Sequence, residues 1–182
     1  MSKERYSAVA VALHWTIAIL ILYNLISGST MESLDGEVKH VVVSLHNSSG
    51  LTILGLSLVR LIVRLLYRPP AFDKTLSGFE RFAAQTVHAL FYLLMIGMPL
   101  IGWAIVSVGR KSTSMLYLVA PMPRIAFLSA LPESDKGFLH KDLVFSHTTG
   151  AWILFALLIA HVSGALKHQF IDRRPQIARM WF

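Results

Sequence analysis

The sequence predicts an all-α integral membrane protein, in which residues 1–182 form one domain of four antiparallel helices. Hydrophobic residues make up 54% of the chain and charged residues only 15%, which does not suit a water-soluble domain. The mean hydropathy of +0.58 agrees with this composition. Apolar stretches long enough to span about 30 Å of hydrocarbon occur four times, so a four-helix membrane bundle is the expected fold.

The predicted spans are residues 9–27, 41–66, 82–107 and 143–166. None of them alternates with a period of two, and backbone groups in lipid need internal partners, so each span is expected to be a helix. The second and third spans are long for a perpendicular crossing, which predicts tilt. The first follows a short basic start, as a signal sequence does. Its roughly 19 residues exceed a signal core and no cleavage motif follows, so we expect it to be retained.

Basic residues are distributed unevenly along the chain, whose formal net charge is +7. Residues 1–8, 60–81 and 167–182 together hold eleven Lys and Arg against four Asp and Glu, whereas the connections 28–40 and 108–142 hold six of each. Because basic segments stay on the inner side of a membrane, both termini are predicted to be cytoplasmic and both connections periplasmic. No basic face carrying base-stacking aromatic residues lies outside the spans, so we expect no nucleic-acid partner.

The chain contains no cysteine. This excludes disulfides, iron–sulfur clusters and the covalent attachment of c-type haem. A haem in this protein would therefore be held by axial coordination alone.

Four histidines inside the spans lie at two depths. His147 and His161 are 14 residues apart in the fourth span, which advances about 21 Å and ends roughly 40° short of four full turns, so they share one helix face. His14 lies near the cytoplasmic surface, as His161 does, and His46 lies near the outer surface, as His147 does. Two levels, each with imidazoles from two helices, are what a stacked pair of six-coordinate haems requires.

Short side chains accompany these histidines, as the close approach of a broad porphyrin requires. Glycine follows three of the four by three or four residues, at Gly50, Gly150 and Gly164. Small residues are also common where membrane helices pack, so each glycine alone is weak support.

Three further polar residues have open roles. Arg60, 14 residues after His46, shares its face at the inner level, where a guanidinium can pair with haem propionates or can simply anchor the helix at the surface. His88 in the third span is an alternative axial ligand, a quinone or propionate partner, or a polar residue packed between helices. His168 at the membrane edge can offer a hydrogen bond to a quinone carbonyl or can be an interfacial surface residue.

Motifs in all four spans follow one pattern. They are Leu13-His14-Trp15, Leu45-His46-Asn47-Ser48-Ser49-Gly50, Val59-Arg60-Leu61-Ile62-Val63-Arg64, Val87-His88, Met98-Pro99-Leu100-Ile101-Gly102, Ser146-His147 and the segment from His161 to His168. This pattern resembles the bacterial cytochrome b561 family of di-haem membrane cytochromes over nearly the whole chain.

The resemblance implies two haem b groups. It assigns His14 and His161 to the iron of the inner haem, and His46 and His147 to the iron of the outer haem. It also implies a multi-pass protein of the bacterial inner membrane that passes electrons to ubiquinone. Within the family, the pattern is similar to the superoxide oxidase branch, whose small four-helix members take electrons from superoxide on the outside.

Three functions follow as hypotheses. In the first, the protein is a superoxide:ubiquinone oxidoreductase, and positive residues at the outer end steer the anion inward. The residues available for steering are Arg110, Lys111, Arg124, Lys136 and Lys141. In the second, it is an electron-transfer subunit whose donor is a periplasmic redox protein. In the third, it is a structural or transport bundle whose histidines bind no cofactor, which the paired depths disfavour.

Overall fold

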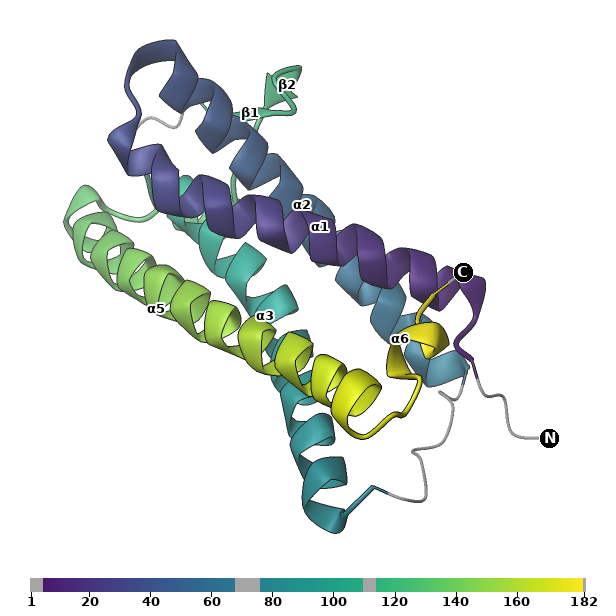
Figure 1. The fold of residues 1–182 in the computed structure, drawn as a ribbon. Helices are drawn as coiled ribbons and strands as arrows, with labels where there is room; N and C mark the ends of the chain where they lie inside the picture. Colours follow the sequence, from purple (N-terminus) through teal and green to yellow (C-terminus); the bar gives the residue numbers. More distant parts are fainter. Residues whose placement is uncertain (1–4, 68–75, 110–113, 182) are drawn as a thin grey trace.

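Four long helices dominate the computed structural model, which describes residues 5–67, 76–109 and 114–181. They are α1 (Ala8–Thr30), α2 (Gly36–Leu66), α3 (Gly78–Val108) and α5 (Glu133–Leu166) (Figure 1). Each is long and apolar enough to cross a membrane. The predicted helical class, with four helices able to span a membrane, is confirmed.

Three of the helices, α2, α3 and α5, begin before their apolar windows because their first turns contain polar residues. α5 begins at Glu133, ten residues before the expected span, with Glu133 and Asp135 in its first turn after Pro132. Acidic side chains there interact favourably with the positive end of the helix dipole. Hydropathy detects the apolar part of a helix that lies in the membrane, and it does not detect a polar first turn that extends into water.

Short elements occupy the connections and the C-terminal region. They are the 3-10 turn η1 (Met31–Ser33), the antiparallel strands β1 (Met115–Leu116) and β2 (Ala120–Pro121), α4 (Ala126–Ser129), the π-helical η2 (Lys167–Ile171) and α6 (Gln176–Arg179). The outer connection predicted for residues 108–142 therefore contains a β-hairpin and the start of α5.

The core lies where the four helices meet, and α1 packs on α2, α2 on α3, and α3 on α5. Buried residues from all four helices form it: Ile17, Ile21, Ile53, Met95 and Leu154. Many other large apolar side chains point away from the bundle, as Leu65 and Leu93 do. A surface of this kind needs hydrocarbon around it, as the predicted lipid bilayer supplies.

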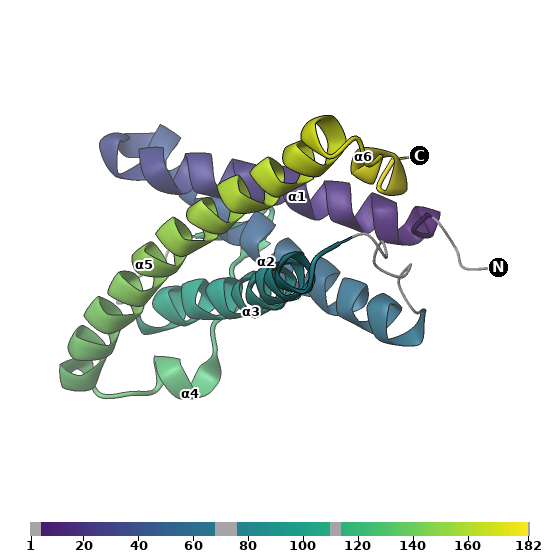
Figure 2. The same ribbon diagram turned by 60° about the horizontal axis from the view of Figure 1, so that its bottom comes forward.

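Both termini lie at the same end of the bundle (Figure 1). α6 runs beside the N-terminal part of α1 in both views (Figure 2). The indole nitrogen of Trp15 donates to the carbonyl of Met180 at 2.8 Å, and the ring of Trp15 contacts that of Trp181. This end, called the inner end below, is the one that the charge distribution predicts to face the cytoplasm.

Candidate functional site

The first pair of imidazoles, at the outer end, comes from α2 and α5. The ring centroids of His46 and His147 are 6.2 Å apart, and the ring planes are inclined at 67°. The structure thus brings together two residues that are 101 positions apart in the chain.

The second pair, at the inner end, comes from α1 and α5. The ring centroids of His14 and His161 are also 6.2 Å apart, with the planes inclined at 59°. His88 of α3 lies against the same site, because its ring centroid is 5.5 Å from that of His161. Its Nδ1 atom is 2.6 Å from the carbonyl oxygen of Ala84, one turn earlier in α3. His88 therefore remains close enough to be an alternative partner of His161.

Both 6.2 Å pairs have the separation that an imidazole–metal–imidazole axis needs. A metal–nitrogen bond to imidazole is about 2 Å, and each ring centre lies roughly 1 Å beyond its nitrogen, so two rings on one metal have centroids about 6 Å apart. Neutral imidazole nitrogens are ligands that haem iron accepts. The donor set therefore fits one six-coordinate haem iron at each end of the bundle.

Ser27 of α1 holds the ring of His46. Its hydroxyl oxygen lies 2.9 Å from Nδ1 of His46 and 3.3 Å from the carbonyl oxygen of Asn24. The direction of the bond between Ser27 and His46 depends on the tautomer of the histidine. When Nε2 of His46 binds a metal, Nδ1 carries the hydrogen and donates it to the Ser27 oxygen, and the hydroxyl hydrogen is then available to the carbonyl of Asn24. Nδ1 of His147 is also buried, and the backbone of Met98 on α3 lies close enough to interact with this ring.

Two glycines lie against the edges of the outer rings. A Cβ atom added to Gly28 of α1 would lie 3.3 Å from Cε1 of His46, and one added to Gly102 of α3 would lie 3.2 Å from Cε1 of His147. Both contacts are tighter than ordinary packing, so a side chain at either position would push on the ring. The contacts of these glycines with the rings were not predicted from the sequence, because each glycine lies on a different helix from the histidine that it contacts.

The three glycines that the sequence drew attention to have different surroundings. Gly150 is in close contact with Met98 of α3, so the packing of α3 on α5 accounts for it. A Cβ atom at Gly50 would have only the Oδ1 atom of Asn24 nearby, at 3.9 Å, and one at Gly164 would have nothing within 4 Å. Only the latter two leave open space next to their helices.

Arg60 directs its guanidinium toward α1 at the inner end. Its Nη1 atom donates to the carbonyl oxygen of Ala10 at 3.4 Å, one turn before His14, and its side chain is half-buried. Arg64, one turn further along α2, instead lies over the ring of Tyr92 at 5.8 Å. Arg60 is thus the arginine turned to the helix that carries His14.

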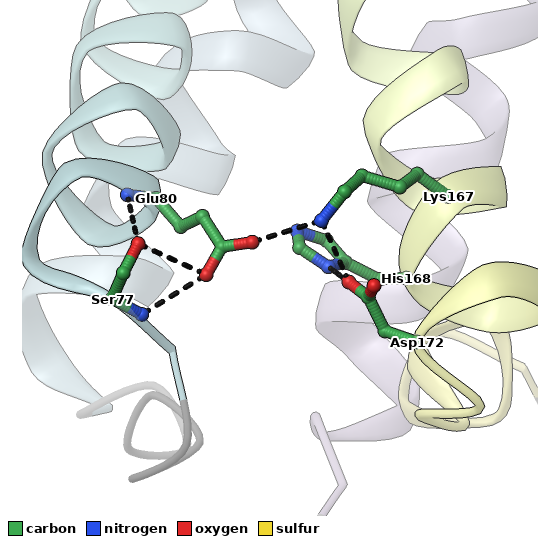
Figure 3. Close-up of polar contacts among 5 residues, drawn as sticks. All are labelled: Ser77, Glu80, Lys167, His168 and Asp172. Carbon is green, nitrogen blue, oxygen red and sulfur yellow. Dashed lines mark hydrogen bonds and ion pairs between the residues drawn. The ribbon is translucent and has the colours of Figure 1, made fainter.

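His168 belongs to an ion-pair network at the inner end of α3 and α5 (Figure 3). Its Nδ1 atom is 2.6 Å from Oδ2 of Asp172, and Nζ of Lys167 is 2.9 Å from the same oxygen and 2.9 Å from Oε1 of Glu80. Glu80 also forms the capping box of α3 with Ser77. Hydrogen bonds from Lys167 and then from His168 hold the pKa of Asp172 below its ordinary value.

One ammonium group bridges the two carboxylates of this network. Glu80, His168 and Asp172 place potential ligand atoms within 4.8 Å of one another. The ammonium group of Lys167 already bonds to both carboxylates, so the cluster needs no metal ion. Its effect is to tie the start of α3 to η2, which extends α5. Sequence reasoning missed this tie because Glu80 and Lys167 are 87 residues apart.

Positive residues at the outer end are largely engaged in local contacts. Arg124 donates to the carbonyl oxygens of Ser107 and Gly109 at the end of α3, and Lys136 pairs with Glu133 at 2.9 Å. Lys141 is exposed. The remaining two candidates for steering, Arg110 and Lys111, lie outside the described residues.

Comparison with known proteins gives a consistent result. The sequence profile of the prokaryotic cytochrome b561 family matches residues 5–182. The chain is 35% identical to cytochrome b562 of Cereibacter sphaeroides, over 96% of this chain and 94% of that protein. It is 29% identical to cytochrome b561 homolog 2 of Escherichia coli, over 98% and 92% of the two chains. It is also 24% identical to the probable superoxide oxidase CybB of Yersinia pestis, over 97% and 96%.

Proposed function

Because this chain belongs to the prokaryotic cytochrome b561 family, we propose that it transfers electrons through two haem b groups, one at each histidine pair. The family binds haem b and carries electrons in the membrane. Four candidate spans and the family make this chain a multi-pass protein of the bacterial inner membrane. A structural or transport role without a cofactor does not agree with this membership.

The observation that carries the proposal is the equal separation of the two histidine pairs, 6.2 Å in each case. In the proposal, His46 and His147 bind the outer haem iron, and His14 and His161 bind the inner one. A bound haem iron supplies one-electron redox chemistry. α5 contributes one imidazole to each site and so fixes their spacing, because 14 helical residues advance about 21 Å.

We propose superoxide as the outer electron donor and ubiquinone as the acceptor at the inner end. The first part draws on the printed name of the Yersinia pestis relative and on the resemblance to superoxide-oxidising members. Each superoxide gives up one electron and leaves as O2, and a quinone takes up two electrons and two protons, so two superoxide anions are consumed per quinol. His168 is the proposed hydrogen-bond partner of the quinone, because Asp172 engages its Nδ1 atom and leaves Nε2 for a carbonyl oxygen. For Arg60 we propose a role as the partner of an inner haem propionate.

A periplasmic redox protein is the second candidate for the donor. Lys136 pairs with Glu133, which offsets its charge locally, whereas Arg124 bonds to neutral carbonyls at the end of α3 and keeps its charge. A neutral outer face of mixed charges suits the docking of a protein at least as well.

The donor is tested by mixing the purified, oxidised protein with a superoxide-generating system and no partner, then adding a water-soluble quinone. Rapid haem reduction that superoxide dismutase abolishes, followed by reoxidation with quinone, is the expected result. Slow reduction by superoxide together with normal reoxidation by quinone would favour the partner protein.

Ligation is tested with matched alanine variants of the two histidines on α5. His147→Ala should remove or perturb the outer haem alone, and His161→Ala the inner haem alone, as seen in reduced-minus-oxidised absorption spectra and haem content. Loss of the inner haem in His88→Ala, with His14→Ala tolerated, would overturn the inner assignment.

A further inference from the structure

The β1–β2 hairpin lies beside α2 and does not extend beyond its outer end (Figure 1). The backbone N–H of Met115 donates to the hydroxyl of Ser44 at 3.0 Å, and that of Tyr117 donates to the hydroxyl of Ser48 at 2.7 Å. One turn further along α2, the hydroxyl of Thr52 is 2.5 Å from that of Tyr117. The hairpin thus follows α2 over three successive turns, and Ser44 and Ser48 are fully buried beneath it.

The position of these contacts along α2 gives the depth of the hairpin. The apolar part of α2 begins at Val41. At 1.5 Å per residue, Ser44 is about 4 Å, Ser48 about 10 Å and Thr52 about 16 Å further along the helix. If the hydrocarbon layer of about 30 Å is centred on residues 41–66, it begins near Ser44. The backbone contact at Ser48 then lies about 6 Å deep and the hydroxyl of Tyr117, at Thr52, about 12 Å deep.

A non-helical segment is tolerated at this depth only when its backbone polar groups have partners within the protein. In addition to the two bonds to serine hydroxyls, the N–H of Val119 donates to the carbonyl of Leu116, and the N–H of Met122 donates to that of Ser114, both at 3.0 Å. Pro121, which pairs opposite Met115, has no N–H to satisfy. These bonds give partners to the N–H groups of Met115, Tyr117, Val119 and Met122, and so satisfy part of what membrane depth requires of the backbone.

The turn of the hairpin has unusual residues for its conformation. Tyr117 and Leu118 have φ angles of 47° and 62°, which are in the left-handed region. A turn with two such residues favours asparagine and glycine, because a bulky side chain is strained there. The side chains of Tyr117 and Leu118 are about half exposed, and that of Val119 is 84% exposed. Apolar side chains thus occupy the tip although the backbone favours small or polar ones.

We propose that the β1–β2 hairpin is inserted into the hydrocarbon of the outer leaflet, with Tyr117, Leu118 and Val119 in contact with acyl chains. Its apolar tip is exposed, as are many apolar side chains on the outward faces of the helices. Insertion explains why apolar residues stand at strained positions and why serines line the face of α2 that the hairpin covers. The outer connection is then partly a membrane element, which fixes its position relative to the bundle.

Spin labelling tests this directly, since the chain has no cysteine and a single introduced one is unique. Val119→Cys is labelled with a nitroxide in liposomes, and its collision rates with oxygen and with a water-soluble nickel chelate are compared. Leu22→Cys on the exposed face of α1 is the hydrocarbon reference, and Ser134→Cys in the first turn of α5 is the aqueous reference. The oxygen-to-nickel ratio at Val119 should resemble that of Leu22.

Two outcomes would overturn the proposal. A ratio equal to that of Ser134 would place the tip in water. Low collision rates with both reagents, together with spin–spin broadening, would show that the tip contacts a second copy of the chain. Neither readout depends on haem, so failure here leaves the proposed electron transfer untouched.

A second variant tests the part played by the apolar side chains. Tyr117→Asn with Leu118→Gly supplies the residues that the turn conformation favours. The hairpin should therefore keep its shape while losing its attraction to hydrocarbon, and the label at Val119 should move toward the aqueous ratio. An unchanged ratio would show that these side chains do not hold the tip in the membrane, contrary to the proposal.

Discussion

Replacing Ser27 by alanine removes the hydroxyl that accepts from Nδ1–H of His46 when Nε2 binds the outer haem iron. The donor would then lose this partner at a buried position, since Ser27 is 4% exposed. An unsatisfied buried polar group costs about 1–3 kcal/mol. Loss of a hydrogen bond that orients a metal-bound histidine weakens metal binding by about 10–100-fold, which corresponds to roughly 1.4–2.7 kcal/mol. The cost of the unpaired donor and the loss of metal affinity are of similar size. We therefore expect the outer haem of Ser27→Ala to bind about 10–100-fold more weakly.

The assay is haem content together with a redox titration followed in the visible spectrum. Ser27→Ala should lose outer haem during purification or shift the potential of one redox transition, and it should leave the other unchanged. Ser29→Ala is the matched control, since Ser29 is exposed on the same helix and bonds only to the carbonyl of Ile26. If Ser27→Ala and Ser29→Ala retain identical haem content and potentials, Ser27 does not orient His46.

Two further predictions follow from local geometry. Gly102→Ala should displace the ring of His147 by a few tenths of an ångström and so perturb the outer haem spectrum. Gly97→Ala on the same helix is the control and should leave the spectrum unchanged, because a Cβ atom there meets nothing within 4 Å. The hydrogen bond from Lys167 holds the pKa of Asp172 below 3.8. The stability that the ionised Asp172 gives to the folded protein is therefore complete above pH 3.8 and is lost as the pH falls through the lowered pKa. Hydrogen exchange of η2, corrected for intrinsic rates, should rise in that acid range. Asp172→Asn should reduce this dependence without removing it, because Glu80 also bonds to Lys167 and is protonated in acid as well. An acid response equal to that of the unchanged protein would contradict the role of Asp172.

The depth of each histidine could be predicted from the sequence because two strong constraints act together. A membrane span must be a helix, and helical geometry places residues 14 positions apart on one face. The spacing of His147 and His161, with the charge distribution, was enough to give two levels. The structure brings each of these residues to a histidine of the same level, His46 and His14 respectively.

Ser27, Gly28 and Gly102 could not be found in this way because their role depends on how helices rotate against one another. Hydropathy gives the length and depth of a span but not the face that meets a neighbour. The start of α3, predicted at residue 82 from hydropathy, in contrast carries a local signal. Ser77 and Glu80 have the spacing of a capping box, which places the helix start four residues before the apolar window. The hairpin gave no signal, because its strands have two residues each and its turn lacks asparagine and glycine.

The different surroundings of the two histidine pairs predict a direction for electron flow. With a haem bound at each pair as proposed, a hydrogen bond from His46 to Ser27 would make His46 a more basic ligand, which would favour oxidised iron and lower the outer potential. The charge of Arg60 beside α1 would favour reduced iron and raise the inner potential. Transfer from the outer haem to the inner one would then be downhill. Arg60→Met should lower the inner potential and reduce this difference, while Arg64→Met, which loses a contact with Tyr92 instead, should change it less. Equal shifts in the two variants would show that the charge of Arg60 has no special position.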